Sequence, residues 1–267
     1  MKKSLFLGAL FFAYAGLSHA TGNYSQPINT YYMDAFIQDV NDVNVKDKQL
    51  KASILTTFKK HASIGYNSAK VFLMGKFYLV SEAGNHYGVK DVYCSRDILD
   101  TEFPSGKAPA PNKVPDDTII NTEHTWPQSR FNSGINKELQ KSDLHHLFPT
   151  DSKINNIRGN YKFGEVQHDA KTLKCQGPRF GTSENGSDMI FEPPQIHKGN
   201  VARAIFYFST KYSLAIDPNE EATLRRWNKA DPVDDEEMTR NTEIEKLQHS
   251  RNPFVDFPEL VDRIGDF

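Results

Sequence analysis

Hydrophobic residues recur at helical spacing in the first and last thirds of the chain, and the middle carries shorter apolar runs. Residues 50–61 show the clearest helical stripe, with lysines on the outward positions. The same spacing predicts helices over residues 69–74, 201–212, 220–229 and 238–248. The pattern therefore predicts a protein in which helices dominate.

The apolar runs of the middle region are too short for helices and predict strands. They cover residues 77–80, 91–94, 118–126 and 144–148, and prolines end the last two. Thr150, Asp151 and Ser152 are N-cap candidates for a helix over 153–158. Residues 103–117, with four prolines, and the polar stretch 176–189 predict irregular loops. We expect a mixed α+β fold without a second-domain boundary.

The first twenty residues have the three parts of a secretory signal peptide. Lys2 and Lys3 precede an apolar run over 5–17, and Ser18-His19-Ala20 places small residues at a cleavage site. The run is short for a membrane span, so an uncleaved anchor is the weaker alternative. We expect residues 1–20 to be removed and 21–267 to form a single soluble domain without membrane contact.

Charge is distributed unevenly along the 267 residues. The whole chain carries 32 Lys and Arg against 34 Asp and Glu, a net charge of −2, which argues against a general nucleic-acid coat protein. Residues 121–180 contain nine basic and six acidic residues, whereas 216–267 contain seven and fourteen. A local basic cluster is sufficient to bind a phosphate backbone with little sequence specificity.

The region 121–160 gathers more polar side chains than a hydrophobic core requires. It contains three His, two Glu, several Asn and two Arg, placed between two predicted strands and a helix. Phosphodiester hydrolysis uses such groups: a neutral His as base, oxygen ligands for Mg²⁺, and a guanidinium on the phosphate. Glu123, His124 and Asn155 supply the first two functions.

Three strings in this region resemble the endonuclease I family of bacterial periplasmic and secreted nucleases. They are Glu-His-Thr-Trp-Pro at 123–127, Ser-Asp-Leu-His-His-Leu-Phe-Pro at 142–149, and Asn-x-x-Arg-Gly-Asn at 155–160. Further likeness lies at 92–94, 191–194, 199–204, 227–229 and 252–255. The resemblance therefore covers most of the chain after residue 20, in the family's order.

The resemblance implies a ββα-metal site in which two antiparallel strands and a helix surround one divalent cation, with a catalytic core of about 118–165. His124 would be the general base, and Glu123 and Asn155 would hold Mg²⁺, which Mn²⁺ or Ca²⁺ could replace. It implies a monomeric periplasmic or secreted endonuclease for DNA, and also RNA, that leaves 5′-phosphate ends. The family also favours pairing of Cys94 with Cys175; the residues alone allow one disulfide or two free thiols.

The chain departs from the family where a phosphate-binding arginine is expected. Many members carry a Cys-flanked insertion that supplies it, but residues 131–140 here are short and lack cysteine. Arg130 is our first choice for this role, and Lys137 is the second. Lys141 also stands where an acidic residue often precedes Ser-Asp. In addition, Glu123 and His124 would face opposite sides of a regular strand, so sharing a site requires an irregular strand or a bridging water.

Other functions also fit some of these residues. His124, His145 and His146 could form the zinc site of a hydrolase with another substrate. Alternatively, the chain could be a non-catalytic nucleic-acid-binding protein of the cell envelope. Arg158 could bind phosphate or, with Gly159, hold the end of the 153–158 helix; we favour the structural role.

Overall fold

The computed structural model describes residues 30–104, 106–184, 186 and 188–267. The signal peptide expected at 1–20 lies outside the described residues. Tyr32–Phe267 form one compact unit. Among the described residues, the structure contains no helix whose length and apolar character would suit a membrane span.

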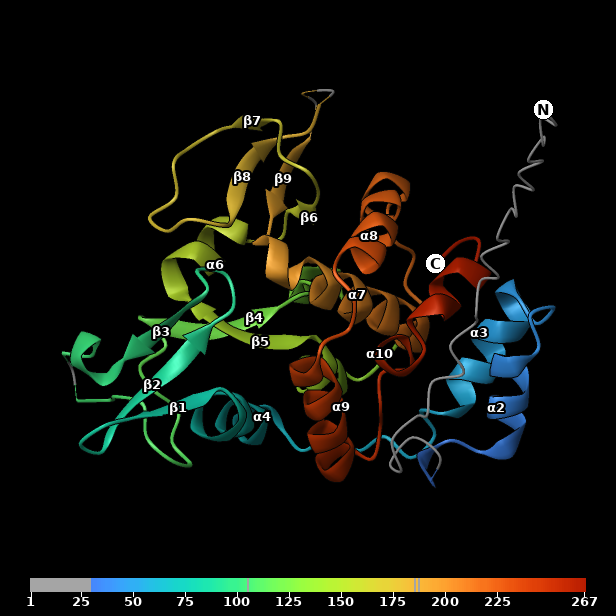
Figure 1. The fold of residues 1–267 in the computed structure, drawn as a ribbon, viewed down its shortest axis with the longest axis horizontal. Coiled ribbons are helices and arrows are strands. Elements are labelled where there is room, and N and C mark those ends of the chain that lie inside the picture. Colours follow the sequence, from blue (N-terminus) through green and yellow to red (C-terminus); the bar gives the residue numbers. More distant parts are fainter. Residues whose placement is uncertain (1–29, 105, 185, 187) are drawn as a thin grey trace, which may run out of the picture. The chain divides into compact units, whose positions relative to one another are not determined.

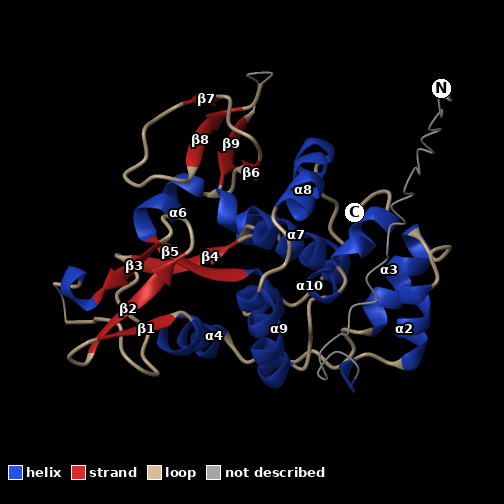
Figure 2. Cartoon of the chain, viewed as in Figure 1, coloured by secondary structure: helices blue, strands red, loops and turns tan. Residues whose placement is uncertain are grey.

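The longer helices lie before and after the central strands in the chain, as the hydrophobic pattern predicts, and the short α5 and α6 lie among the strands (Figures 1 and 2). Caps recur at their starts, for example at α8, where the Asp217 carboxylate accepts from the amides of Asn219 and Glu220. The described α-helices are α2 (Asp34–Asn41), α3 (Asp47–Thr56), α4 (Tyr66–Phe72), α5 (Lys137–Lys141), α6 (Ser152–Arg158), α7 (Lys198–Tyr212), α8 (Pro218–Ala230), α9 (Asp235–Gln248) and α10 (Pro253–Asp256).

Three small sheets occupy the middle of the described chain. One has the order β1-β2-β3, one is the pair β4-β5, and one has the order β6-β9-β8-β7. All pairings are antiparallel except that between β6 and β9. The mixed α+β class, with helices dominant, is confirmed. The strands are β1 (Leu79–Glu82), β2 (His86–Asp91), β3 (Arg96–Leu99), β4 (Ile120–His124), β5 (Leu147–Asp151), β6 (Lys162–Phe163), β7 (His168–Asp169), β8 (Arg179–Thr182) and β9 (Met189–Glu192).

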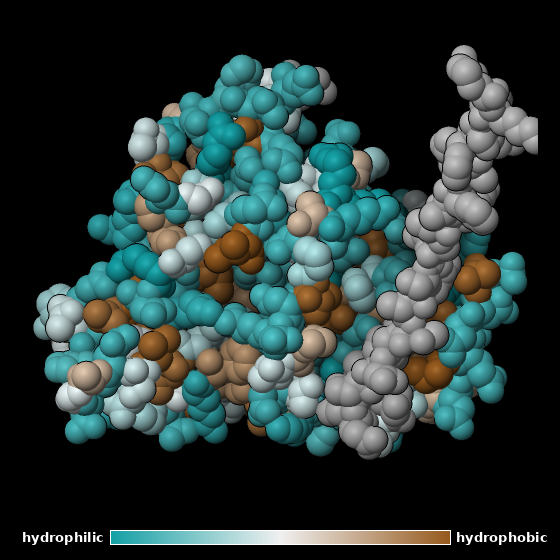
Figure 3. Space-filling model, viewed as in Figure 1, coloured by the Kyte–Doolittle hydropathy of each residue, from teal (hydrophilic) through white to brown (hydrophobic). Residues whose placement is uncertain are grey.

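Helix α7 is the centre of the core. Val201, Phe206, Tyr207 and Phe208 on it are fully buried, and the Phe208 ring lies 5.5 Å from the ring of Trp126. Burying such aromatic side chains contributes a large share of the hydrophobic stabilisation. On the face drawn in Figure 3, hydrophilic residues dominate and hydrophobic ones are scattered in small groups.

Three local predictions are wrong, two of them because a polar side chain redirects the backbone and one because a neighbouring strand supplies the pairing. Residues 144–146 form a 3₁₀ turn, since the Asp143 carboxylate accepts from the amide of His145, and the strand begins only at Leu147. The strand expected at 91–94 is absent: β2 ends at Asp91. The chain turns there because Asp91 Oδ1 accepts from the amides of Tyr93 and Cys94. The expected loop over 176–189 contains β8.

The disulfide favoured by the family resemblance is confirmed. Cys94 and Cys175 are bonded, with their Cα atoms 5.5 Å apart and 81 positions between them in sequence. Cys94 lies in the turn between β2 and β3, and Cys175 lies in the segment before β8. The bond therefore joins the turn between two strands of the first sheet to the β7–β8 connection of the third.

Candidate nuclease site

The frame of the candidate site is the antiparallel pair β4–β5, followed directly by α6. The register places Glu123 opposite Phe148 and His124 opposite Leu147, without interruption. Asp151 ends β5 and caps α6, because its Oδ1 accepts from the amides of Lys153 and Ile154 at 2.9 and 3.2 Å. This confirms Asp151 among the three N-cap candidates.

Glu123 lies on the face of β4 that α6 covers. Its side chain is only 2% exposed, and its Oε1 lies 3.1 Å from Nε of the equally buried Arg158. Burial raises the pKa of the Glu123 carboxyl, while the charge of Arg158 and a hydrogen bond from Tyr93 act in the opposite direction. Arg158 also donates to the carbonyls of Thr125 and Gly159 at 2.6 and 2.8 Å. Arg158 therefore has the structural role.

Asn155 projects from α6 toward the same face of β4. Its Nδ2 donates to Oδ1 of Asn121 at 2.6 Å, and within the described part of the chain no group donates to its Oδ1. Asn121 and Glu123 are two residues apart on β4 and so share a face. The α6 side of β4 thus presents a carboxylate and an amide oxygen, donors of the kind that hold hard cations such as Mg²⁺. The Arg158 guanidinium offsets part of the carboxylate's charge.

His124 points to the other face of β4. Its Nε2 lies 3.2 Å from the carbonyl oxygen of Lys141, and its ring centroid lies 5.5 Å from that of Tyr66 and 5.3 Å from that of His146. Burial, aided by the neighbouring His146, holds the pKa of His124 well below its usual value. A neutral imidazole that donates from Nε2 keeps Nδ1 as its proton acceptor.

Because β4 is a regular strand, Glu123 and His124 contact different groups. In the described structure β4 pairs only with β5, so the other edge of β4 has no strand partner. A cavity of about 320 Å³ is lined there by Asn121 and Thr122, neighbours that belong to opposite faces, and by Tyr66. Asn121 contacts Asn155, whereas Tyr66 contacts His124. The cavity lining does not include Glu123, His124 or Asn155, but one lining residue contacts Asn155 and another contacts His124.

Arg130 has protein partners outside this frame. It lies in the 3₁₀ turn Gln128–Arg130, its NH2 is 3.3 Å from Glu220 Oε2, and its guanidinium lies 4.9 Å from the Trp126 ring centroid. Glu220 in turn accepts from the amide of Phe163 at 2.9 Å. The structure thus does not bring Arg130 to the residues of β4 and α6, and its phosphate role stays a prediction.

The two histidines after Asp143 are bonded within the interior. His145 Nε2 lies 3.0 Å from the Ser250 carbonyl oxygen, and His146 Nε2 lies 2.8 Å from that of Gln140. Burial lowers the pKa of His145 to about 3 and that of His146 to about 4. Across the described ranges, no group of three or more His, Cys, Asp or Glu residues is arranged to hold a metal ion. The arrangement gives no support to a three-histidine zinc site.

Helix α9 fastens the turn that leads into β5. Arg240 donates to the carbonyls of Leu144 and Leu147, the latter at 2.8 Å. Gln248 accepts from the Leu144 amide at 2.7 Å and donates to the Ser142 carbonyl at 3.3 Å. The position of β5, and through it β4, depends on side chains that lie about a hundred residues later in the chain.

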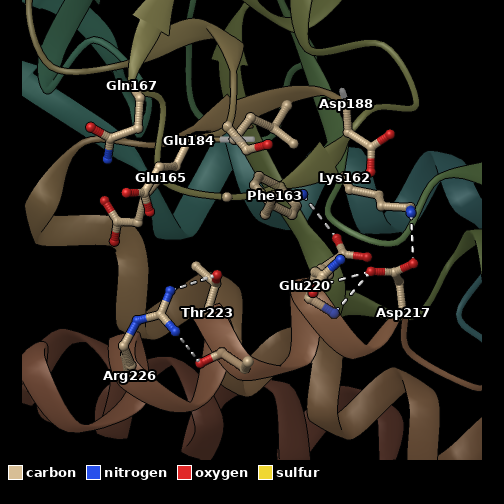
Figure 4. A pocket seen from close by; sticks show the side chains of 15 residues that line it. Lys162, Phe163, Glu165, Gln167, Glu184, Asp188, Asp217, Glu220, Thr223 and Arg226 are labelled. Carbon is tan, nitrogen blue, oxygen red and sulfur yellow. Dashed lines mark hydrogen bonds and ion pairs between the residues drawn. The ribbon is translucent and has the colours of Figure 1, made fainter. Parts of the chain in front are cut away.

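A separate cavity of about 370 Å³ between α8 and the third sheet is rich in carboxylates (Figure 4). Glu165, Glu184 and Asp188 line it without an equal number of basic residues. Lys162 is paired with Asp217 at 2.7 Å. The negative charge of this cavity would repel a phosphate backbone, so the edge of β4 remains the better candidate for binding nucleic acid.

Comparison with known proteins decides the family. The endonuclease I family matches residues 46–259. The chain belongs to the endonuclease I family. An extracellular ribonuclease of Bacillus subtilis (strain 168) is 36% identical over 162 residues, which cover 54% of this chain and 53% of the relative. A periplasmic deoxyribonuclease of Aeromonas hydrophila is 30% identical over 131 residues, 48% of this chain and 53% of the relative. The chain thus spans about half the length of these curated relatives.

Sequence reasoning found the strand and helix residues of this endonuclease I chain but missed Tyr66 and Lys70, which lie beside the edge cavity. Both come from α4, some fifty residues before β4. Neither stands in a polar string, so only the packing of α4 against β4 reveals them.

Proposed function

We propose that this protein is a divalent-metal-dependent endonuclease that hydrolyses phosphodiester bonds of DNA and RNA with little sequence specificity and leaves 5′-phosphate ends. The proposal rests on the family and on relatives named as extracellular or periplasmic nucleases, one a ribonuclease and another a deoxyribonuclease. Nothing in the sequence suggests a base-reading module, which agrees with low specificity.

One observation carries the proposal. The edge cavity beside β4 adjoins Asn121, which holds Asn155, and Tyr66, which lies against His124. A phosphodiester at this unpaired edge would have a neutral imidazole on one side and oxygen ligands on the other. Glu123 and His124 can then act on the same phosphodiester although they lie on opposite faces of β4, because each reaches the substrate and no direct contact between them is needed.

In this scheme His124 moves the proton. Its Nε2–H bond to the Lys141 carbonyl fixes the tautomer, and Nδ1 accepts a proton from the attacking water as the water oxygen bonds to phosphorus. Glu123 and Asn155 would hold Mg²⁺, or Mn²⁺ or Ca²⁺ in its place, which when bound supplies positive charge for the phosphate and the departing 3′-oxygen. Asn121 orients Asn155 through the 2.6 Å amide–amide bond.

Metal removal tests the reaction class directly. Purified protein is incubated with supercoiled plasmid and, separately, with RNA in Mg²⁺, with and without excess EDTA. We expect cleavage of both substrates that EDTA abolishes and added Mg²⁺ restores. Labelling of the ends with and without phosphatase treatment checks for 5′-phosphates. Undiminished cleavage in EDTA would refute the metal requirement.

Replacement of the base tests the role of His124. His124→Ala should lower kcat by about 10²- to 10⁴-fold, because a positioned general base contributes about that much. His168→Ala, at an exposed histidine on β7, is the matched control and should retain activity. Circular dichroism of both variants checks folding. A fully active His124→Ala protein at neutral pH would remove His124 from the mechanism.

We also propose that the protein acts as a monomer in the periplasm or outside the cell after removal of residues 1–20. The names of the relatives support this location. Fractionation of expressing cells, with the mass of the exported chain, locates the protein and its N-terminus, and light scattering gives its oligomeric state. A cytoplasmic chain of full mass would contradict the proposed location.

A further inference from the structure

Two lysines lie over the Tyr66 ring: Lys70, which lines the edge cavity of β4, and Lys141, which lies outside the cavity lining. The Nζ of Lys141 lies 4.3 Å, and that of Lys70 5.2 Å, from the centroid of the Tyr66 ring. Among the described residues, neither ammonium is within ion-pair distance of a carboxylate. By contrast, Lys198 pairs with Glu192 and Lys211 with Asp143. Half-buried Lys51 also lacks a carboxylate partner, but its ammonium donates to the Asp266 carbonyl at 2.7 Å.

The Tyr66 ring connects these two charges to His124. Its centroid lies 5.5 Å from that of the His124 imidazole, and Tyr66 and Thr122 of β4 line the same cavity. Ammonium groups above an aromatic face are held by its quadrupole without being neutralised. Tyr66 therefore keeps both positive charges close to the proposed base while leaving them available to an anion.

Two carboxylates lie near this cluster, and neither forms an ion pair with Lys70 or Lys141. Glu138 accepts from the backbone amide of Tyr66 through Oε1 at 2.8 Å. Asp117 is exposed and lines the cavity without pairing with either lysine. The cavity, about 320 Å³, exceeds the roughly 30 Å³ that a water molecule occupies in the liquid, so it has room for a phosphate group with its waters.

We propose that Lys70 and Lys141, held over Tyr66, form a phosphate-binding subsite that positions a nucleic-acid strand at the edge of β4 beside His124. The inference rests on the proposed function and assigns the substrate-binding role that the short 131–140 segment leaves open. Lys141 would serve twice: its carbonyl orients His124, and its ammonium binds phosphate. Substitution of its side chain leaves the carbonyl in place.

The test measures binding separately from cleavage. Lys70→Gln, Lys141→Gln and the double variant are titrated against a fluorescent single-stranded oligonucleotide in EDTA at several NaCl concentrations. Each single change should raise Kd about three- to tenfold and reduce the slope of log K against log salt by about 0.7, the loss of one phosphate contact. Lys70→Arg and Lys141→Arg should restore both values. Lys48→Gln, at an exposed lysine on α3, is the matched control and should change neither.

Kinetics with Mg²⁺ separates this inference from the proposed function. We expect the glutamine variants to have a higher KM and a kcat within about twofold of the parent's. The lost phosphate contact stabilises the bound substrate and the transition state equally, so its loss weakens binding without slowing the chemical step. If the unaltered protein cleaves nucleic acid while the variants keep its Kd, KM and salt slope, the subsite is refuted and the function stands. If the protein binds through these lysines but never cleaves, the subsite stands and the function fails. Thermal unfolding checks that every variant folds.

Discussion

At the scale of single residues, Arg158 shows how one side chain can organise a site without entering it. It is 1% exposed and contacts the Glu123 carboxylate and two backbone carbonyls, while its guanidinium lies 4.5 Å from the Phe163 ring centroid. A buried arginine with this many partners is fixed in position. Arg158 thus sets where the Glu123 carboxylate lies between β4 and α6.

Removal of this arginine should cost much more stability than removal of an exposed one. In Arg158→Met the buried Glu123 carboxylate loses its ion pair, so we expect the free energy of unfolding to fall by about 3–5 kcal/mol. Urea unfolding followed by fluorescence measures the change. Adding Glu123→Gln should recover part of the loss. Arg226→Gln, whose guanidinium bonds only within α8, should stay within about 0.5 kcal/mol of the parent.

The residues that the sequence revealed are those joined by local rules. Glu123, His124 and Asn155 stand in strings with recognisable spacing, and the Asp151 cap follows from its place before an apolar helix. Tyr66 and Lys70 were not found, because their approach to β4 depends on how α4 packs. The burial of His145 and His146 was equally hidden, since their partners Ser250 and Gln140 are set by the tertiary fold.

At the scale of elements, helical periodicity was read more reliably than strand position. The long helices α7, α8 and α9 begin two or three residues before the predicted starts because caps and first turns are polar. β8 was missed because its sequence is short and bounded by glycine and polar residues, and its partner β9 supplies the pairing. Strand identity in such small sheets depends on neighbours more than on propensity.

The disulfide between the β2–β3 turn and the segment before β8 gives a prediction at this scale. In Cys94→Ala/Cys175→Ala the unfolded chain loses a loop closure of 81 positions, so we expect about 4 kcal/mol less free energy of unfolding. Urea unfolding measures the loss. Dithiothreitol should destabilise the parent by a similar amount and leave the double variant unchanged. An equal effect of the reductant on both proteins would contradict this account.

At the scale of the whole molecule, the interior holds several histidines in their neutral form. Burial lowers the pKa of His61 and His146 to about 4, and that of His145 and His197 to about 3. In the unfolded chain these groups take up protons near pH 6.5. The unfolded state therefore binds more protons between about pH 6.5 and 3. The contribution of these groups to stability is complete above this window and is lost as the pH falls through it.

His197 allows this linkage to be measured at a buried histidine that the proposed mechanism does not use. Its ring packs edge-on against Phe148 with centroids 4.7 Å apart, and its Nε2 has no hydrogen-bond partner in the described structure. His197→Phe keeps a planar ring and removes the titration. Between pH 4 and 6 the slope of unfolding free energy against pH should fall by about 1.4 kcal/mol per unit, the contribution of one proton. The exposed His168→Phe variant should keep the parent's slope.

The bonds from α9 to the turn before β5 also bear on when the proposed site can assemble during synthesis. Gln248 holds Leu144 across 104 positions, and Arg240 reaches Leu147 across 93. A chain made from its N-terminus has completed β4, β5 and α6 long before these side chains emerge from the ribosome. Until then the turn into β5 lacks its anchors, so we expect the proposed site at the edge of β4 to stay unassembled during most of synthesis. The order of the sequence thus separates in time the making of a proposed RNA- and DNA-cleaving site from the RNA machine that makes it.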